Sequence, residues 1–379
     1  MNKKLHILFL CGWYPSRVLP NNGDFIQRHA EAVTLKHTVS VLHIVSDENC
    51  IKKIEIDSKE INGVKTYIGY IKKTSNSILK FIRFWRAYLI LLKKIDRYDV
   101  VHLNETFPFG LFALHLKWFQ KKVFIISEHW TGYYFPQSKN INFLKHFICK
   151  KILKNASFIC PVSNSLKKEM ENLGFTGNYK IIPNVIDASL FIPSKKTEKN
   201  YTIIHVSSLL DKHKNISGML KVAKELEKII TTFTWKFIGG NKSKYEALIK
   251  ELNFTTAKIE FINHISHKKL ITHIQSSNLF VSFSNYETFG IVMMEALSCG
   301  IPVISTNTGI LSELTPNDFF SIIPIKDEKK LLNEILKKHN TNKELEKNKM
   351  HNFVAQNYTK EVIANQFSKM YFKALNNNY

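Results

Sequence analysis

Short apolar runs alternate with longer amphipathic stretches along the first half of the chain. Strands buried on both faces are predicted for five of these runs: Leu5–Cys11, Val39–Val45, Val100–Leu103, Val123–Ser127 and Phe158–Val162. Apolar positions at helical spacing predict helices over Asp24–Leu35 and Ile78–Ile95. Strands that alternate with helices form parallel sheets covered by helices, so the pattern indicates an α/β fold.

The second half of the chain repeats this alternation. Five further strands are predicted: Thr202–Val206, Thr234–Ile238, Ile259–Phe261, Leu279–Phe283 and Pro302–Ser305. Helices are predicted over Ile216–Leu226, Lys242–Leu252, Ile291–Leu297 and, at the end, about Lys360–Leu375. The polar segment Pro193–Asn200 is the best linker candidate. Two doubly wound domains follow, with ligands expected in a cleft at the carboxyl ends of their strands.

Length and charge refine this picture. The 379 residues are too many for one compact core, and 44% of them are hydrophobic, so each half can bury its own core. Residues 1–190 hold 28 basic and 14 acidic residues, so this half carries +14 of the net +23 and the rest carries +9. A positive field favours anionic partners, although Lys is abundant throughout and compositional drift is an alternative.

Cysteine usage and the first residues bear on the compartment. The five cysteines are scattered without a CxxC pair, which argues against a disulfide framework and fits a reducing cytosol. The basic start followed by Leu5–Cys11 superficially resembles a signal peptide, but no small-residue cleavage site follows, so a first buried strand is predicted. No run approaches the roughly 20 apolar residues that cross a bilayer.

The most specific motif lies in residues 285–304. Phe289-Gly290 is predicted to open a helix, whose first N–H groups and dipole favour an anion such as a diphosphate. Gly300 and Pro302 are predicted to end it. Glu287 precedes this helix and Glu295 lies on its second turn, so two carboxylates can accept hydrogen bonds from hydroxyls that flank a phosphate. A pair of glutamates that only complements the helix dipole is the alternative.

Glu287-x7-Glu295 with the Phe289-Gly290 turn and the Gly300–Ile304 segment resembles the signature of glycosyltransferase family 4 (glycosyl transferases group 1). Pro183–Asp187 and His205–Leu209 also resemble that family, so the likeness covers nearly the whole chain. The resemblance implies a GT-B fold: an acceptor-binding Rossmann-like domain over 1–190, and a nucleotide-sugar-binding one over 191–359. The last helix, 360–379, is expected to pack back on the first domain.

The resemblance also assigns donor-binding residues. It implies that Glu287 contacts the donor sugar and Glu295 the nucleotide ribose, and it places Lys214 against the diphosphate. Ser208 stands where the family commonly has an arginine, which leaves the neutralisation of the phosphates incompletely explained. The remaining expected donor-binding positions are Gly239, Gly240, His264, Ile265, Phe289, Gly290, Ile291 and Val292. Without the resemblance, the glycine pair is equally well explained by a tight turn.

The first domain offers four further candidates. His129, at the end of a predicted strand, matches a family histidine that hydrogen-bonds the transferred sugar, so His129 and Glu287 are the expected catalytic residues. Gly23 precedes a helix and would let backbone N–H groups face a phosphate or acceptor; a capping turn with Asp24 at the cap is the alternative. Asn104 and Glu105 follow another strand and are expected on the acceptor side.

Metal binding is not expected. His264-x-x-His267 has no third ligand at suitable spacing, and no Asp-x-Asp pair is present. The resemblance implies metal-independent transfer, in which helix N–H groups and Lys214 take the place of the cation. No cofactor is expected besides the nucleotide-diphosphate-sugar substrate.

Two basic segments concern location. Lys72–Arg97 contains eight basic residues and one acid, and Lys80, Arg83, Arg86, Lys93 and Arg97 are predicted to share a helical face. Lys139–Lys154 contains five lysines and no acid. Each predicts a basic amphipathic helix that can lie on an anionic bilayer, or else a core-packed helix with a solvated basic face.

The leading hypothesis is a retaining hexosyltransferase of bacterial surface polysaccharide or lipopolysaccharide synthesis. It would use a glycan or lipid-linked acceptor, in the cytoplasm or peripherally on the inner face of the membrane. A GT-B nucleotide-sugar epimerase, which needs no acceptor, is the alternative. A basic nucleic-acid binder is a remote third: no reader motif is present, and the cleft carboxylates would repel phosphates, so nucleic acid is not an expected partner.

Overall fold

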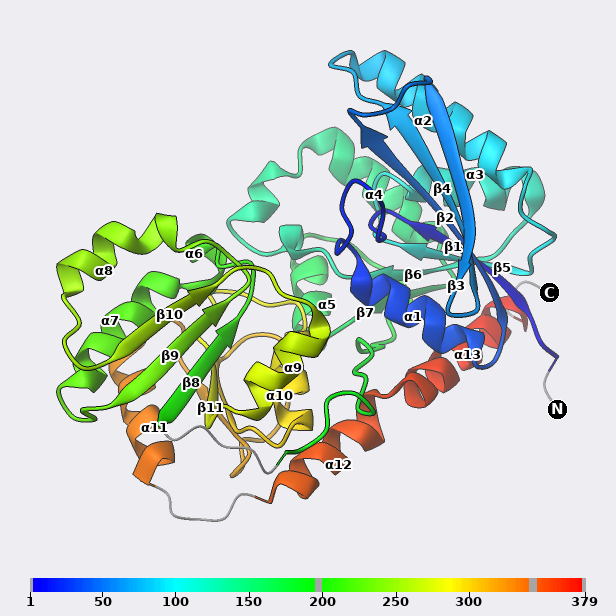
Figure 1. Ribbon diagram of the computed structural model, residues 1–379. Helices are drawn as coiled ribbons and strands as arrows, with labels where there is room; N and C mark the ends of the chain where they lie inside the picture. Colours follow the sequence, from blue (N-terminus) through cyan, green and yellow to red (C-terminus); the bar gives the residue numbers. More distant parts are fainter. Residues whose placement is uncertain (1–2, 195–199, 341–345, 377–379) are drawn as a thin grey trace. The chain divides into compact units, whose positions relative to one another are not determined.

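The computed structural model describes residues 3–194, 200–340 and 346–376 and divides the chain into two compact units. Unit 1 comprises Met1–Val185 with Lys360–Tyr379, and unit 2 comprises Ile186–Thr359. Each unit has its own β-sheet with helices packed against it (Figure 1). The predicted α/β class with two Rossmann-like sheets is confirmed. Most of the predicted linker Pro193–Asn200 lies outside the described residues.

Unit 1 contains a seven-stranded sheet of order β3-β4-β2-β1-β5-β6-β7. Its strands are β1 (His6–Cys11), β2 (Thr38–Asp47), β3 (Ile54–Ile61), β4 (Val64–Lys72), β5 (Val100–Asn104), β6 (Phe124–Glu128) and β7 (Phe158–Pro161). All neighbouring pairs are parallel except β3–β4, which is a hairpin at the sheet edge. The parallel strands are almost entirely buried because helices cover both faces.

Two groups of helices cover this sheet (Figure 1). The two helices α1 (Asp24–Thr34) and α13 (Lys360–Asn376) pack together on one face, and Phe367 and Tyr371 of α13 join its core. The other face carries α2 (Ser77–Leu92), α3 (Gly110–Gln120) and α4 (Phe143–Asn155). The remaining helix of unit 1 is α5 (Asn164–Asn172). A helix from the far end of the sequence thus completes the core of the first unit.

The structure corrects the two basic segments. The helix α2 spans Ser77–Leu92 with Lys93 as its C-cap, so Arg97 lies beyond the predicted helical face, and Lys72 belongs to β4. Likewise α4 begins only at Phe143, and Lys139 lies in a separate 3-10 turn over Gln137–Asn140. Both predicted segments begin too early, because they follow runs of basic residues. The helices themselves begin where the Asn76 and Asn142 side chains cap them.

Unit 2 contains a six-stranded sheet of order β10-β9-β8-β11-β12-β13, in which every neighbouring pair is parallel. Its strands are β8 (Tyr201–Val206), β9 (Phe233–Ile238), β10 (Lys258–Ile262), β11 (Leu279–Ser282), β12 (Val303–Thr306) and β13 (Phe320–Ile323). The five predicted strands are confirmed to within two residues at each end. The sixth, β13, was not predicted.

The helices of unit 2 are α6 (Asp211–Lys214), α7 (Ile216–Glu227), α8 (Glu246–Leu252), α9 (His267–Gln275), α10 (Ile291–Ser298), α11 (Glu328–Asn340) and α12 (Lys347–Tyr358). The predicted helix Lys242–Leu252 is wrong in its first part, where a 3-10 turn precedes α8. The predicted end of α10 is confirmed: Gly300 has φ 73°, and the Ile301 N–H donates to the Ala296 carbonyl at 3.0 Å.

No helix in the described part of the chain is both long and apolar enough to cross a membrane.

Candidate functional site

Each sheet has one point at which the order of its strands reverses, and open α/β sheets bind ligands at such points. In unit 2 this point lies between β8 and β11, and in unit 1 it lies between β1 and β5. The loops that leave the carboxyl ends of these strands carry most of the predicted site residues. The topology therefore indicates one candidate binding region in each unit.

Glu287 is the centre of the candidate region in unit 2. Its carboxylate forms an ion pair with Lys214 Nζ and accepts a hydrogen bond from Ser284 Oγ at 2.8 Å. Glu287 and Lys214 are both mostly buried; Glu287 comes from the loop after β11, and Lys214 ends the short helix α6 that follows β8. The predicted sugar-binding carboxylate and the predicted phosphate-binding lysine are therefore direct partners. The sequence predicts that they contact separate groups of the donor, but it does not predict that they pair.

The Glu287 loop is held from two sides by hydrogen bonds to its backbone. The Asn285 N–H donates to the His213 carbonyl at 2.9 Å, which ties this loop to α6. On the other side, Thr306 Oγ1 at the end of β12 donates to the Ser284 carbonyl at 2.6 Å. The candidate carboxylate thus sits on a rigid support, and neither supporting residue was predicted.

Gly309, in the loop after β12, closes tightly on the same segment. It has φ 64°, and a Cβ built there would lie 2.6 Å from the Phe289 carbonyl oxygen and 3.1 Å from Glu287 Cβ. The next residue, Ile310, donates its N–H to that Phe289 carbonyl at 2.9 Å. Only glycine fits both the backbone angle and the approach. In the sequence, the only sign of a role for Gly309 is its position shortly after the predicted strand Pro302–Ser305.

The helix α10 begins directly after this loop. Gly290 is its N-cap with φ 87°, Phe289 is buried, and Ile291 and Val292 at the first turn are half-buried. The first N–H groups of a helix lack intrahelical acceptors, so this turn can bind an anion. Glu295 on the second turn is only 2% exposed, deeper than Glu287. The predicted placement of both glutamates around the helix start is confirmed; their ligands stay a prediction.

The glycine pair after β9 has a structural explanation. Gly239 has φ 112°, and a Cβ there would lie 2.2 Å from the Ser207 carbonyl oxygen. A Cβ on Gly240 would lie 3.0 Å from Leu209 Cβ. The loops after β8 and β9 therefore pack together through these glycines, which accounts for the tight-turn alternative. A role in nucleotide binding remains a prediction.

Three other predicted donor residues lie on more open loops. Ser208 is exposed in the loop after β8, close in sequence to Lys214. His264 is exposed and Ile265 is half-buried, and both follow the edge strand β10, two strands away from β8. His267 is exposed as well, and the described residues contain no group of three His, Cys, Asp or Glu that could hold a metal ion.

Gly23 in unit 1 is also explained by local packing. It is the N-cap of α1 with φ 75°, and a Cβ there would lie 2.6 Å from the Trp13 backbone carbon. The alternative with Asp24 at the cap is wrong: Asp24 is the first helical residue, 3.6 Å from Arg28 in an ion pair. Gly23 is therefore required by the close approach of the loop after β1.

Glu128, at the end of β6, organises the candidate region of unit 1. It is fully buried, and one carboxylate oxygen accepts from the N–H groups of His129 at 2.9 Å and Trp130 at 3.0 Å. The other accepts from the Thr106 N–H at 3.0 Å, from Thr106 Oγ1 at 2.6 Å and from the Tyr133 hydroxyl at 3.0 Å. Five donors hold this one side chain. Glu128 thus joins the loops after β5 and β6, a role that no motif in the sequence indicates.

His129 is buried beside Phe25 and His29, with ring centroids 4.7 and 5.4 Å away. Burial lowers its pKa well below the ordinary value, and nearby His29 and His102 act in the same direction. Neither ring nitrogen has a hydrogen-bond partner among the described residues. A neutral imidazole has one donor and one acceptor, and this ring leaves both unsatisfied, which is unusual for a buried polar side chain.

Asn104 and Glu105 lie at the reversal point between β1 and β5. Asn104 is buried, and its Oδ1 has no partner among the described residues. Glu105 has φ 74°, and a Cβ on Gly12 would lie 2.2 Å from its carboxylate. Burial, aided by the charge of Glu128 and opposed by Lys145, raises the pKa of Glu105 to about 9. This carboxyl group therefore carries a proton at neutral pH.

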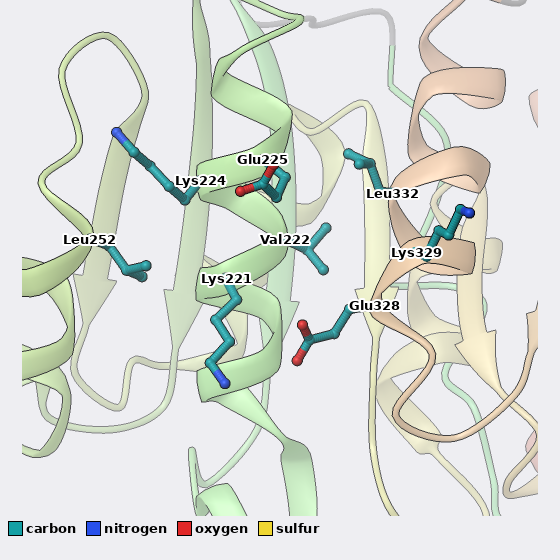
Figure 2. A pocket seen from close by; sticks show the side chains of 8 residues that line it. All are labelled: Lys221, Val222, Lys224, Glu225, Leu252, Glu328, Lys329 and Leu332. Atoms are coloured by element: carbon teal, nitrogen blue, oxygen red, sulfur yellow. The ribbon is translucent and has the colours of Figure 1, made fainter.

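A separate pocket of about 480 Å³ lies in unit 2 on helices rather than at strand ends. Figure 2 shows its eight lining side chains, which come from α7, from α11 and from the end of α8. None of the predicted site residues is among them. This pocket is therefore distinct from the candidate donor region.

Two family models match the chain, one on each side of residue 190. The model described as Glycosyltransferase Family 4 matches residues 30–190, and the model described as Glycosyl transferases group 1 matches residues 188–353. Together they span most of both units.

The chain is also similar in sequence to individual curated proteins. The 2-deoxystreptamine N-acetyl-D-glucosaminyltransferase of Niallia circulans is 24% identical over 245 residues, which cover 59% of this chain and 62% of that protein. A 41.2 kDa protein of the cps region of Klebsiella pneumoniae is 22% identical over 301 residues, 75% of this chain and 82% of that protein. Two other curated relatives are aligned over only 44% and 61% of their own lengths, so the chain spans about half of them.

Solved structures share the fold. The Anabaena protein Alr3699/HepE, crystallised with UDP and glucose, superimposes with a TM-score of 0.71 at 14% identity, over 96% of this chain and 98% of that one. At this identity the similarity establishes the GT-B fold.

Proposed function

The chain belongs to the glycosyltransferases of family 4 type with the GT-B fold, and on that premise we propose that it transfers a sugar from a nucleotide-diphosphate sugar to a glycan or lipid-linked acceptor. The observation that carries this proposal is the cluster of Glu287, Lys214 and the α10 N-terminus at the strand reversal of unit 2. That cluster combines hydroxyl acceptors with positive charge, and a sugar diphosphate requires both.

The proposed division of labour in unit 2 follows from charge. The diphosphate binds at the first turn of α10, where Lys214 and the helix N–H groups stabilise the negative charge that develops as it leaves. Glu287 accepts hydrogen bonds from hydroxyls of the donor sugar, and Glu295 accepts from the ribose. The Lys214–Glu287 ion pair supports this assignment, because each side chain restricts the position of the other.

Residues of unit 1 are assigned to sugar and acceptor hydroxyls. We assign one ring nitrogen of His129 to a hydroxyl of the transferred sugar, because neither nitrogen has a partner among the described residues. Asn104 Oδ1 accepts a hydrogen bond from the acceptor, and the protonated Glu105 carboxyl donates one. Neutral groups suit this task, since hydroxyl recognition needs no charge.

We further propose retention of anomeric configuration by front-face attack, without a metal ion. Lys214 and the α10 N–H groups supply the positive charge that a cation would otherwise give. The expected observation is a product with the donor's anomeric configuration by NMR, formed equally well in excess EDTA. An inverted product contradicts the retaining mechanism, and loss of activity in EDTA contradicts metal independence.

The cellular role is proposed from the relatives' names. The Klebsiella relative is described by its cps region, and the name of a relative from Arabidopsis thaliana, a phosphatidylinositol N-acetylglucosaminyltransferase, includes a lipid. The first description supports a role in bacterial surface polysaccharide or lipopolysaccharide synthesis, and the second supports a lipid-linked acceptor. We place the protein in the cytoplasm, peripherally on the inner face of the cell membrane.

A thermal-shift panel with uridine, guanosine, adenosine and cytidine diphosphates and their sugars tests donor binding. One nucleotide series should stabilise the wild type, and Glu295→Ala should lose that response. Glu225→Ala, on an exposed part of α7, is the matched control and should keep it. Conversion of a nucleotide sugar without any acceptor would instead indicate an epimerase.

A further inference from the structure

The helices α2, α3 and α4 of unit 1 leave an apolar groove of about 390 Å³ on the face that they share. Its lining includes Phe81 and Trp85 of α2, Trp118 of α3, and Phe147 and Ile148 of α4. The volume lies within the roughly 300–1,000 Å³ of small-molecule sites, and such sites are mostly apolar. The groove is unrelated to the strand-end loops that carry the candidate site.

Large apolar side chains around this groove are exposed to an unusual degree. Phe143 is 87% exposed, Phe119 78% and Trp118 51%. The same helices bury other apolar residues against the sheet, such as Leu91 of α2 and Ile152 of α4. These helices are apolar both on the side that packs against the sheet and on the side that faces solvent. Large exposed apolar patches of this kind mark interaction surfaces.

The charge around the groove identifies that partner. The three helices carry eight Lys or Arg residues, three on α2, one on α3 and four on α4, and no Asp or Glu. Among the described residues, Lys150, Lys151 and Lys154 have no carboxylate partner. Lys151 Nζ lies 5.2 Å from the centroid of the Trp118 ring, so charge and aromatic surface adjoin. Aromatic rings next to flexible cations are typical of the membrane interface.

We infer that the α2–α3–α4 face is a lipid-binding surface: the groove takes a hydrocarbon chain of an anionic membrane lipid, and the surrounding lysines contact acidic headgroups. An acidic protein that also presents apolar side chains is the other candidate occupant, and failure to bind mixed vesicles would favour it. Phosphate-bearing lipids satisfy both features.

The lipid-binding surface comprises three helices rather than the two basic segments predicted from the sequence. The helix α3, which the charge pattern did not single out, contributes Trp118 and Phe119 to the centre of the surface. Only the biological role of this surface rests on the proposed function, since a lipid-linked acceptor would require the enzyme to bind the membrane. Vesicle binding can be measured without any sugar donor, so the two proposals fail independently.

The experiment is co-flotation of the full chain with vesicles of phosphatidylcholine alone or mixed with phosphatidylglycerol. Binding is expected only to the mixed vesicles. Replacing Lys150, Lys151 and Lys154 by Gln should weaken it by about fivefold for each charge. The matched control replaces Lys221, Lys250 and Lys329, exposed lysines of unit 2, by Gln and should bind as the wild type does.

Insertion into the groove is tested by tryptophan fluorescence with lipids brominated along the acyl chain. Quenching is expected in the wild type and should be reduced in Trp118→Ser, whose exposed position makes misfolding an inadequate explanation. Both variants should keep the wild-type thermal shift with nucleotides. Binding without quenching, or equal binding to neutral vesicles, overturns the inference. So does a stable dimer that Trp118→Ser dissociates, because a second copy would then be the occupant.

Discussion

The two units place carboxylates at equivalent points of similar sheets but treat their charge in opposite ways. In unit 2, Glu287 is ion-paired with Lys214. In unit 1, Glu105 has no ion pair among the described residues, and burial raises its pKa to about 9. Mostly buried charges are stable when they are paired, whereas recognition of neutral hydroxyls needs only uncharged donors and acceptors. The two units share the sheet architecture, but the residues around each carboxyl group determine its charge state.

The comparison is tested most severely by Glu287→Ala, which removes the paired carboxylate from unit 2. We expect kcat/KM to fall about a thousandfold, or ~4 kcal/mol, because hydrogen bonds from sugar hydroxyls to a charged acceptor are lost and Lys214 loses its partner. Initial rates at several donor concentrations measure this. Ser284→Ala, which removes only a supporting hydrogen bond, should cost far less. A loss below about threefold in Glu287→Ala would show that the pair is structural.

Glu128→Gln tests how unit 1 holds a buried carboxyl group by hydrogen bonds from five donors. An amide keeps one acceptor oxygen but turns an NH₂ group towards existing donors, so we expect the free energy of unfolding to fall by about 3 kcal/mol. Urea denaturation followed by circular dichroism measures this. The exposed Glu60→Gln is the control and should stay within about 0.5 kcal/mol of the wild type. Equal stability of the two variants would rule out the bracing role.

Gly309→Ala and Gly174→Ala separate backbone strain from steric contact in the two units. Both glycines have positive φ, 64° and 76°, but only Gly309 would place a Cβ against other atoms. We expect a loss of about 1 kcal/mol in the free energy of unfolding for Gly174→Ala and about 2 kcal/mol for Gly309→Ala. Donor binding by thermal shift should weaken in Gly309→Ala alone. Identical behaviour of the two variants would mean that the Phe289 loop yields to the methyl group.

Glu105→Gln gives the smallest and most specific effect, a change in pH dependence. The folded-state pKa of about 9 exceeds the ordinary 4.5, so the native state keeps a proton that the unfolded state loses. Wild-type stability contributed by this group therefore falls as pH rises above about 4.5. The variant should gain roughly 1 kcal/mol on the wild type between about pH 5 and pH 8, allowing for the partial exposure of the group. A difference that does not vary with pH would contradict the assignment.

Glu227→Gln in unit 2 tests a carboxyl group whose pKa is shifted in the opposite direction, below the ordinary value. Burial alone would raise the pKa of Glu227, but Lys224 and the N–H groups of Thr255, Thr256 and Ala257 together lower it to about 2. Its stabilising contribution is present above about pH 4.5 and is lost as pH falls towards 2. The variant should therefore be less stable than the wild type at about pH 7, with a smaller difference in acid; urea denaturation at both pH values measures this.

Patterns of adjacent residues predicted most of the fold. Buried parallel strands are continuous apolar runs, so ten strands were located from the sequence. The hairpin β3–β4 was missed although Asn62-Gly63 between two alternating segments is a strong turn signal. The short strand β13 was missed because its four residues, Phe320–Ile323, carry too little periodicity to separate it from a loop.

The candidate site was predictable only where one motif held it. Glu287, Gly290 and Glu295 lie in one strand–turn–helix segment, so their spacing in the sequence set their arrangement. Glu128 and Gly309 act through contacts with other segments, at Thr106 and Phe289, and no pattern within their own segments shows such partners. Burial of both His129 nitrogens likewise depends on aromatic residues of α1, which are distant in the sequence.

The helix α13 imposes an order on events during synthesis. Tyr371 donates or accepts a hydrogen bond with His102 at 2.7 Å, Ser368 pairs with His37 at 2.9 Å, and Lys360 pairs with Glu31 at 2.9 Å. A chain that emerges from the ribosome therefore exposes the open face of the first sheet until residues 360–376 have been translated. Unit 2, continuous from residue 186 to 359, can close first. We expect unit 1, although most of it is translated first, to complete its folding after unit 2. Until α13 has been translated, unit 1 is expected to depend on chaperones.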